Sequence, residues 1–538
     1  MPPIRKRYIF FLLIIIIAST FLLIDLKKKM FVETKMESFS KLGAPLFNHQ
    51  GYYHHMITTN SPRTQRYFDQ GLIFFYSLNY TEAIRSFTEG IRLDPRCAIC
   101  YWGLSLSWGS KDNILSTDRE TKNAVKALKK ALEYSQESTP LEQAYIEALA
   151  SRYIPFGSQN YVLAMKSVME RFPLDVDAKN LYAAALFDNI GYNIYTRNRL
   201  RTSEGNEIIH AMNEALKIEP ENPVSHYFYA LAMEYSEHPE QGIASAEFLR
   251  KSAPKIERFI NTSSHIYMLT GQYQNASAAN RRAVGAHREY IGEAWSQGFE
   301  PEKSTFYLYN IDLLCCAATL EGKSRLALDT AEDLVRQVPR IVATDSDVQT
   351  FYAVPYLTKI QFKFWSEILK EPPPAENLTY QKGIWHYARG MAFLHLENIE
   401  RAEEEKQLLE QSQKQRKGLR RLNVASEILE ATIAEHKGDE ASMIEHWQRA
   451  VALEEEIQHD APFIWYFQAK NGLANALFKA ERLDEAEIAY LEALKQYPEN
   501  GRSLFGLQQT LSLQGRDQEA SDVELRFEKA WLESDVIP

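Results

Sequence analysis

Two cysteines at C-x-x-C spacing are the residues of this chain whose type and spacing most plainly suggest chemistry. Cys97 and Cys100 stand in the stretch DPRCAICYWG and are two of only four cysteines in 538 residues. Such a pair serves as a redox centre, as half of a metal site, as a haem anchor or as packing. A haem anchor requires histidine directly after the second cysteine, and Tyr101 stands there instead. A thioredoxin-type redox centre requires a flanking βαβ pattern, and the sequence shows none.

Catalytic motifs of the common kinds are absent from the sequence. It contains no Gly-rich phosphate loop, no H-E-x-x-H and no G-x-S-x-G. A net charge of −10 argues against a protein that neutralises many phosphates. The composition, 45% hydrophobic and 25% charged, is that of an ordered chain with an ample core. We therefore expect a non-catalytic protein with no nucleic-acid partner.

The amino terminus predicts a membrane anchor. A basic tail at residues 1–7 precedes an uncharged apolar run at residues 8–24, close to the lower limit of about 17 residues for a spanning helix. A cleaved signal peptide would have a shorter apolar core followed by a small-x-small site, whereas Ala18 lies inside the run. We expect an uncleaved signal anchor at residues 8–26, a single membrane pass, and a large domain outside the cytoplasm or in a lumen.

A repeat of about 34 residues organises most of the chain. In residues 64–95 the small residues Gly71 and Ala83 take positions 8 and 20 of the repeat, and Phe87 takes position 24. Two antiparallel helices approach closely only where small side chains meet, and an aromatic ring fills the remaining notch. The same register recurs at residues 223–254, 308–339 and 467–498, and looser copies lie at 257–284, 383–409, 424–450 and from 501 onward.

This spacing resembles the tetratricopeptide repeat, a helix-turn-helix unit. Residues 46–330 also resemble a largely uncharacterised family of such repeat proteins with a histidine-rich N-terminal segment, here LFNHQGYYHHMITTNSPRTQRYFDQGL, followed by DPRCAICYWG and ALASRY. No alternating strand pattern of useful length competes with helices. We therefore expect an all-α fold, an α-solenoid of stacked repeats that buries a shared core and leaves a concave surface for binding.

The middle repeats of that family tend to carry histidines, and this chain departs from the pattern. Glu234 and His265 match the family. The positions at which the family often has histidine hold other residues here, namely Tyr227, Leu231, Arg258, Asn261, Tyr309 and Asp312. This departure weighs against carrying a metal role over from the family to this chain.

Positions 2, 5, 9 and 12 of each first helix share one face, which turns toward the concave side of the stack. Arg258 on this face would grip a carboxylate, and Glu234 or Asp312 would hold a basic group. The alternative is a wetted inner surface whose charges pair with one another. The polar patch that we predict to be a binding groove consists of Tyr227, Glu234, Arg258, Asn261, His265, Tyr309 and Asp312.

The same register places both cysteines on the concave side. With Gly103 at position 8 of its repeat, Cys97 and Cys100 fall at positions 2 and 5. Three interpretations stay open. The cysteines hold zinc or another transition metal together with His54 and His55, they form a disulfide in an oxidising lumen, or they are two small residues that line the groove. The sequence favours the third interpretation.

The predicted organisation has six parts. They are a basic tail at 1–7, the anchor at 8–26, a linker with the histidine-containing segment at 27–61, a repeat array with insertions at 62–370, a Pro-rich linker at 371–382 and a second repeat array at 383–535. We expect a membrane-tethered, non-catalytic scaffold that binds a partner protein, peptide or ligand and needs no cofactor. The alternative is a groove that binds a metal or a small ligand through His, Cys and carboxylate side chains.

Overall fold

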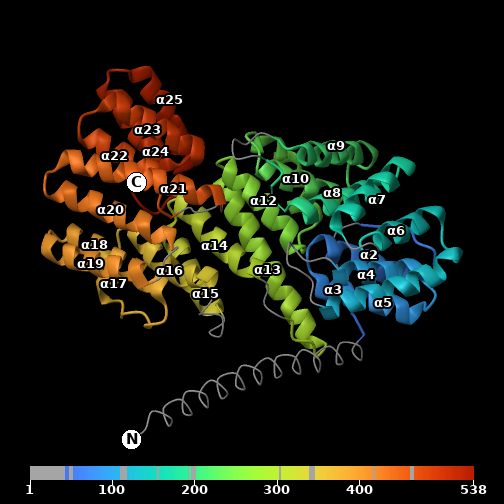
Figure 1. Ribbon diagram of the computed structural model, residues 1–538. Coiled ribbons are helices and arrows are strands. Elements are labelled where there is room, and N and C mark those ends of the chain that lie inside the picture. The colour runs from blue at the N-terminus through green and yellow to red at the C-terminus, as the bar shows by residue number, and fades with distance from the viewer. Residues whose placement is uncertain are drawn as a thin grey trace, which may run out of the picture. The chain divides into compact units, whose positions relative to one another are not determined.

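The fold is all-α, as the repeat pattern predicts (Figure 1). The computed structural model describes residues 43–47, 53–109, 118–153, 157–191, 193–195, 201–301, 305–338, 346–415, 419–460 and 466–538. In these ranges the regular elements are helices, and the only β contact is an isolated bridge between Tyr195 and Arg201.

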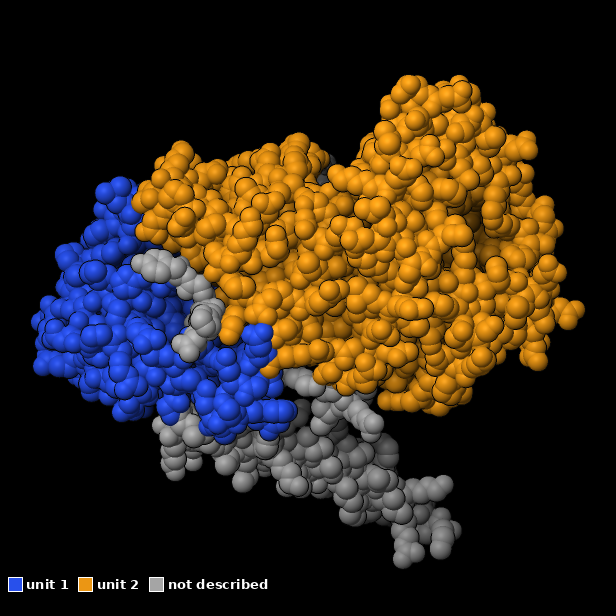
Figure 2. Space-filling model, turned by 180° about the vertical axis from the view of Figure 1, so that it is seen from behind, with its two compact units in different colours: residues 1–191, 289–302 blue, residues 192–288, 303–538 orange. Residues whose placement is uncertain are grey.

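The chain forms two compact units (Figure 2). Unit 1 comprises residues 1–191 and 289–302, and unit 2 comprises residues 192–288 and 303–538. The Pro-rich stretch at 371–382, which the sequence predicts as a linker between two repeat arrays, lies within unit 2.

Side-chain caps define where several helices of unit 1 begin. Ser61 accepts a hydrogen bond from a backbone NH of the first turn of α2, Thr139 and Glu142 form a capping box at α6, and Asp175 caps α8. Each such cap stabilises its helix by about 1 kcal/mol. The described helices of this unit are α2 (Pro62–Tyr76), α3 (Tyr80–Leu93), α4 (Ala98–Gly109), α5 (Asp118–Tyr134), α6 (Pro140–Ala150), α7 (Ser158–Arg171) and α8 (Val176–Ile190).

Small residues set the packing between α2, α3 and α4. The ring of Phe87 on α3 lies against Gly71 on α2 and Gly103 on α4. A Cβ atom added at Gly71 would come within 2.7 Å of that ring, and one added at Gly103 would come closer still. Ala83 on α3 is fully buried. The small residues that identify the repeat in the sequence are therefore the ones that let its helices approach.

Unit 2 continues the same arrangement of helical hairpins. First helices of successive repeats contact one another, as α10 with α12, α12 with α14, α14 with α16 and α16 with α18, which is what stacked hairpins produce. The last eight residues of α13 belong to unit 1. The described helices of unit 2 are α9 (Ser203–Ile218), α10 (Pro223–Glu234), α11 (Ile243–Ser252), α12 (Glu257–Leu269), α13 (Tyr273–Ser296), α14 (Thr305–Leu320), α15 (Ser324–Gln337), α16 (Ser346–Gln361), α17 (Trp365–Lys370), α18 (Thr379–His395), α19 (Ile399–Gln415), α20 (Arg420–His436), α21 (Glu440–Asp460), α22 (Ala469–Lys479), α23 (Leu483–Gln496), α24 (Gly501–Leu513) and α25 (Asp517–Ala530).

The C-terminal end of unit 2 packs against repeats from the middle of the same unit. The hydroxyl of Tyr273, at the start of α13, donates to the backbone oxygen of Pro498 at 2.7 Å. After α25, the carboxylate of Asp535 accepts from the backbone nitrogen of Ser324 at 2.7 Å, at the start of α15. Repeats that are far apart in the sequence are therefore joined inside unit 2.

In the part of the chain that the structure describes, no helix is both long enough and apolar enough to cross a lipid bilayer. The predicted basic tail at 1–7, the predicted anchor at 8–26 and the linker up to residue 42 lie outside the described residues.

Candidate functional site

The histidine-containing residues ahead of α2 form an extended segment. We call residues 43–47 and 53–60 the leading segment. His55 and Ile57 are buried, whereas Met56 between them is 80% exposed. This alternation is that of an extended backbone, in which successive side chains point to opposite sides.

Side chains of α2 and α6 hold the backbone of the leading segment. The backbone nitrogen of Ile57 donates to Oε1 of Gln65 at 3.0 Å, and that of Thr58 donates to Oε1 of Glu142 at 2.8 Å. In the opposite direction, Nε2 of Gln65 donates to the backbone oxygen of His55 at 2.7 Å. Because these bonds use backbone atoms of the segment, they recognise an extended chain whatever its side chains are.

The same helix α2 holds the upstream part of the leading segment. The backbone nitrogen of Phe47 donates to Oε1 of Gln70 at 2.8 Å. The amide nitrogen of Gln70 donates in turn to the backbone oxygen of Pro45 at 2.8 Å, and the hydroxyl of Tyr67 donates to the backbone oxygen of Ala44 at 2.8 Å. Side chains within residues 65–70 of α2 therefore bond to backbone atoms in both parts of the leading segment.

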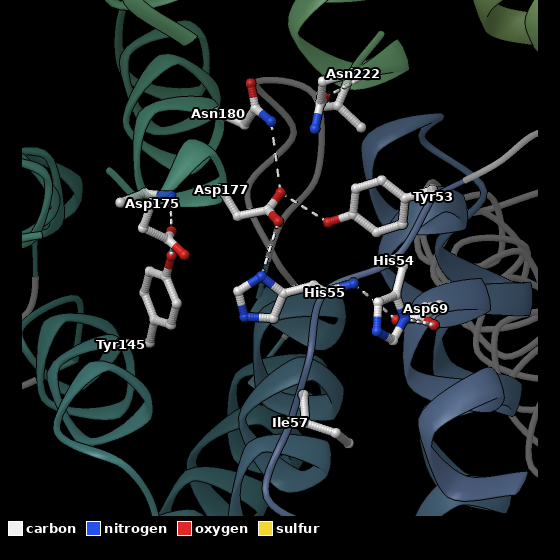
Figure 3. A network of polar contacts seen from close by, with 12 residues as sticks. Tyr53, His54, His55, Ile57, Asp69, Tyr145, Asp175, Asp177, Asn180 and Asn222 are labelled. Carbon is white, nitrogen blue, oxygen red and sulfur yellow. Dashed lines mark hydrogen bonds and ion pairs between the residues drawn. The ribbon is translucent and has the colours of Figure 1, made fainter. Parts of the chain in front are cut away.

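A buried ion pair fixes the centre of the leading segment to α8 (Figure 3). Nδ1 of His55 lies 2.8 Å from Oδ2 of Asp177, and both side chains are less than a tenth exposed. Oδ1 of Asp177 accepts from the hydroxyl of Tyr53 at 2.7 Å and from that of Tyr76 at 3.2 Å. Asp177 is thus surrounded by donors from the leading segment and from α2.

The two members of this pair hold each other in their charged forms. Burial alone would lower the pKa of His55, but the hydrogen bond and charge of Asp177 raise it to about 9. Burial would raise the pKa of Asp177, but His55 lowers it below its usual value. At neutral pH the pair is therefore an imidazolium and a carboxylate. Burial and the charge of Asp177 raise the pKa of the neighbouring Asp175.

The second histidine of the segment faces a different carboxylate. Nδ1 of His54 lies 2.9 Å from Oδ2 of Asp69 on α2. Oδ1 of Asp69 accepts from the backbone nitrogen of His55 at 3.1 Å. Burial raises the pKa of Asp69, and these two hydrogen bonds oppose the rise. The adjacent histidines therefore point to two carboxylates on two helices (Figure 3).

The four residues predicted as a metal site, Cys97, Cys100, His54 and His55, do not converge. The two cysteines form a disulfide with their Cα atoms 5.3 Å apart, and both are buried at the start of α4. Oxidised sulfurs are not thiolate ligands. The described residues contain no group of three or more His, Cys, Asp or Glu side chains that could hold a metal ion. The sequence favoured two small residues that line the groove, and the structure instead joins them in a disulfide. The bond forms because side chains three residues apart lie close together at the start of a helix.

The polar patch predicted as a binding groove lies in unit 2 and is mostly buried. Tyr227, Glu234, Arg258 and Asn261 are less than a tenth exposed, His265 and Asp312 are partly exposed, and Tyr309 is 45% exposed. Tyr309 packs edge-on against the ring of Phe351.

Most of the polar side chains in this patch form hydrogen bonds with one another. Arg258 donates from Nη1 to Oδ1 of Asn261 at 3.2 Å and from Nε to the hydroxyl of Tyr227 at 3.3 Å. Nδ1 of His265 lies 2.6 Å from Oε1 of Glu234. These side chains therefore use part of their hydrogen-bonding capacity within the patch itself.

Asp312 stands apart from these contacts, and residues from the C-terminal repeats bond to it. The hydroxyl of Tyr466, just ahead of α22, donates to Oδ1 of Asp312 at 2.5 Å. The backbone oxygen of Tyr466 accepts from Nε2 of Gln361 on α16 at 2.8 Å, and Arg502 on α24 donates to the side-chain and backbone oxygens of Gln361 at 2.9 Å. Burial raises the pKa of Asp312 to about 6. A residue predicted to face an open groove therefore lies in a contact between repeats of one unit.

Sequence reasoning missed the carboxylates that contact the leading segment. Glu142 is visible in the sequence only as the acid of a capping box with Thr139, and Asp177 only as an acid in the first turn of a helix. Their partners, Thr58 and His55, lie 84 and 122 positions away in the chain. No short-range pattern signals such a pairing.

The repeats at the C-terminal end of unit 2 also match a known family. Residues 466–531, which hold α22 to α25, match the family model of the tetratricopeptide repeat. This part of the chain is therefore built of tetratricopeptide repeats. No curated protein matches this repeat protein.

Two solved structures show how distant the likeness to other proteins is. The human IFIT1 dimer with m7Gppp-AAAA is 13% identical, covers 88% of this chain and 91% of its own, and has a TM-score of 0.31. The tetratricopeptide-repeat domain of P58(IPK) is 11% identical, covers 85% of this chain and 99% of its own, and has a TM-score of 0.21. Likeness at this level carries nothing about ligands over to this chain.

Proposed function

We propose that this tetratricopeptide-repeat protein is a non-catalytic scaffold, tethered to a membrane, that binds an extended peptide segment of a partner protein. The observation that supports this proposal most directly is the set of hydrogen bonds that bind the leading segment to unit 1. We call the side chains that hold it the segment-binding face, which consists of Gln65, Asp69, Gln70, Glu142 and Asp177.

The contacts of the segment-binding face are those expected of peptide recognition. Its carboxylate and amide oxygens accept from backbone nitrogens at residues 47, 55, 57 and 58. Main-chain hydrogen bonds provide affinity for any extended peptide, and side-chain contacts add specificity. A net charge of −10 favours a protein or peptide partner over a nucleic acid.

The chemistry of the buried groups supports a non-catalytic role. His55 is held as an imidazolium by Asp177, so it has no free lone pair with which to act as a general base. Burial raises the pKa of Cys315 to about 12, which keeps that thiol protonated and poorly nucleophilic. Cys97 and Cys100 are already oxidised.

The membrane tether rests on the apolar run at residues 8–24. The Cys97–Cys100 disulfide is compatible with a large domain in an oxidising compartment outside the cytoplasm. We expect the full-length chain to remain in the membrane pellet after an alkaline carbonate wash and to keep residues 8–26 in its mature N-terminal peptide. A wholly soluble protein that begins after residue 24 would overturn the tether and leave peptide binding untouched.

Selection from a peptide library tests the binding function. Immobilised full-length protein should enrich a set of peptides that bind at one-to-one stoichiometry, and photo-crosslinks from these peptides should fall on α2, α6 and α8. A helical repeat protein of similar net charge serves as the control for unspecific binding. Failure to enrich any peptide above that control would overturn the proposed function.

Metal analysis separates this function from a metal-binding groove. Mass-spectrometric metal analysis of the purified protein, with and without a mild reductant, should find no stoichiometric zinc, copper or iron, because the candidate ligands are engaged elsewhere. One metal ion per chain that is lost in a His54→Ala and His55→Ala variant would favour the metal-binding alternative.

A further inference from the structure

We propose that the leading segment is an intramolecular competitor for the segment-binding face of unit 1, and that the partner which displaces it is a basic, extended peptide. The inference rests on the proposed function and specifies its ligand and its regulation. It is carried by the charges of the face, by the geometry of the bound segment and by the covalent connection between the two.

The segment-binding face is acidic where it meets the side chains of the leading segment. Asp177 pairs with His55 at 2.8 Å, and Asp69 pairs with His54 at 2.9 Å. Glu142 accepts from both the backbone nitrogen and the hydroxyl of Thr58. If the segment leaves, Asp177 loses the imidazolium that faces it, and Asp69 loses the hydrogen-bonding ring of His54. An uncompensated charge near or below the surface is costly, so a replacement that carries positive charge is strongly favoured.

The bound segment also defines the spacing of the groups that the face recognises. Tyr53 donates to Asp177 through its hydroxyl, His55 pairs with the same carboxylate two residues later, and Thr58 donates to Glu142 at 2.5 Å three residues after that. We expect a displacing peptide to carry an aromatic hydroxyl, a cation and an aliphatic hydroxyl at this spacing. Lysine, arginine or protonated histidine would serve as the cation.

The covalent connection makes the leading segment an effective competitor. The segment runs directly into α2 at Pro62, so its local concentration at the face is of the order of millimolar or higher. A free peptide competes with that concentration, and its apparent affinity is reduced by the fraction of time that the face is covered. Any change that loosens the segment should therefore tighten binding of a peptide in trans.

A fluorescently labelled peptide with the sequence of residues 51–60, GYYHHMITTN, tests the competition. Binding to the full-length protein is measured by fluorescence anisotropy for the wild type and for the double variant His55→Ala, Thr58→Val. The double variant loses the ion pair and one hydroxyl contact, so we expect it to bind the peptide at least about tenfold more tightly than the wild type. A Met56→Ala variant, altered at an outward-facing side chain, should bind like the wild type.

Two further measurements test the chemistry of the site. Adding Asp177→Asn and Glu142→Gln to the double variant should abolish the gain in affinity. Replacing both histidines of the free peptide by lysine should preserve binding to the double variant, and replacing them by alanine should remove it. An unrelated lysine-rich peptide of equal length that binds the wild type and the double variant alike would reduce the effect to general charge attraction and overturn the proposal.

Circular dichroism and melting of each variant show whether it is folded. If the double variant unfolds, a Tyr53→Phe variant, which loses one hydrogen bond, replaces it with an expected gain of about threefold. A folded variant that binds the peptide no better than the wild type overturns the competition. Library peptides that still crosslink to α2, α6 and α8 of that variant would leave the proposed function standing, whereas absence of all peptide binding would remove both.

Discussion

The buried pair of His55 and Asp177 ties a segment without helical structure to the body of unit 1. Nδ1 and Oδ2 lie 2.8 Å apart, and the two tyrosine hydroxyls on Oδ1 satisfy the remaining capacity of the carboxylate. A buried ion pair of this kind contributes little net stability compared with apolar packing, but breaking it by removing one partner is costly. The pair therefore fixes the leading segment to α8, and removing either partner would leave the other buried without its counter-charge.

The raised pKa of His55 predicts how stability depends on pH. The pKa is about 9 in the folded chain and 6.5 for an ordinary histidine, so the folded state binds this proton more tightly than the unfolded state. The contribution is complete below pH 6.5 and is lost as the pH rises through about 9. It amounts to about 3 kcal/mol. Urea unfolding between pH 6 and about pH 10 measures it.

A His55→Gln variant should lack this part of the pH dependence. His238, which is exposed in unit 2, provides a matched control, and His238→Gln should keep the pH profile of the wild type. A His55→Gln profile parallel to that of the wild type across this window would contradict a charged His55 in the folded state.

At the scale of the helix, small side chains decide how closely neighbouring elements pack. Ala83 on α3, Ala327 on α15 and Ala486 on α23 take the same place in their repeats, and all three are fully buried. Packing at these places is dense, so extra atoms have nowhere to go without moving a helix.

Substituting leucine at any one of these three alanines should therefore destabilise the protein by about 1–3 kcal/mol through overpacking. Thermal melting of the purified variants measures the effect. Thr88→Leu, at an exposed position of α3, adds a similar side chain without overpacking and should melt like the wild type. Unchanged melting of all three alanine variants would show that the repeat register is misassigned.

A buried glutamate links α21 to α22 and predicts a second pH effect. Glu454 on α21 accepts from the backbone nitrogen of Ala469, the first residue of α22, at 2.8 Å. Its other oxygen, Oε1, is buried without a donor among the described residues. Burial raises the pKa of Glu454 from its usual 4.5 to about 7, although Lys470 opposes the rise and Glu455 adds to it.

Between pH 4.5 and 7 the folded state therefore holds a proton on Glu454 that the unfolded state has lost. The stability of unit 2 should fall by about 3 kcal/mol across that window from this group alone. A Glu454→Gln variant should lack the fall, so its stability relative to the wild type should increase from pH 4.5 to 7. Glu456→Gln, at an exposed position of α21, should show no such change. A constant difference between Glu454→Gln and the wild type would contradict the prediction.

At the scale of the whole chain, residues of each unit cover helix faces of that same unit, although the repeat pattern predicts an open binding surface. In unit 1 the leading segment covers side chains of α2, α6 and α8. In unit 2, Tyr466 bonds to Asp312 on α14, and the C-terminal end reaches α13 and α15. Any partner of these faces competes with the chain itself.

The C-terminal contact of unit 2 predicts a local effect far away in the sequence. The carboxylate of Asp535 accepts from the backbone nitrogens of Ser324 and Arg325. An Asp535→Ala variant should lose this helix cap, worth about 1 kcal/mol, and amide hydrogen exchange of Ser324 should become several times faster. Glu533→Ala removes only a surface pair with Lys323 and should leave that amide protected. Equal protection of the Ser324 amide in all three proteins would contradict the contact.

The helices and their register could be predicted from the sequence because the contacts that specify them are local. Gly71, Phe87 and Gly103 meet in one seam although each lies on a different helix, and neighbouring repeats bring such positions together wherever the pattern occurs. The same reasoning placed Cys97 and Cys100 one turn apart on one face, which is the geometry that their disulfide requires.

Only the tertiary structure decided which residues contact the helix faces of each unit. His55 meets Asp177 across 122 positions, and Tyr466 meets Asp312 across 154 positions. Two things determine these contacts: the path of a non-helical segment, and the sum of many small rotations from repeat to repeat. Neither leaves a periodic signal in the sequence. The partner of each carboxylate is therefore decided by how the chain folds back on itself. A buried carboxylate needs a hydrogen-bond donor, and only the tertiary structure determines which donor lies close to it.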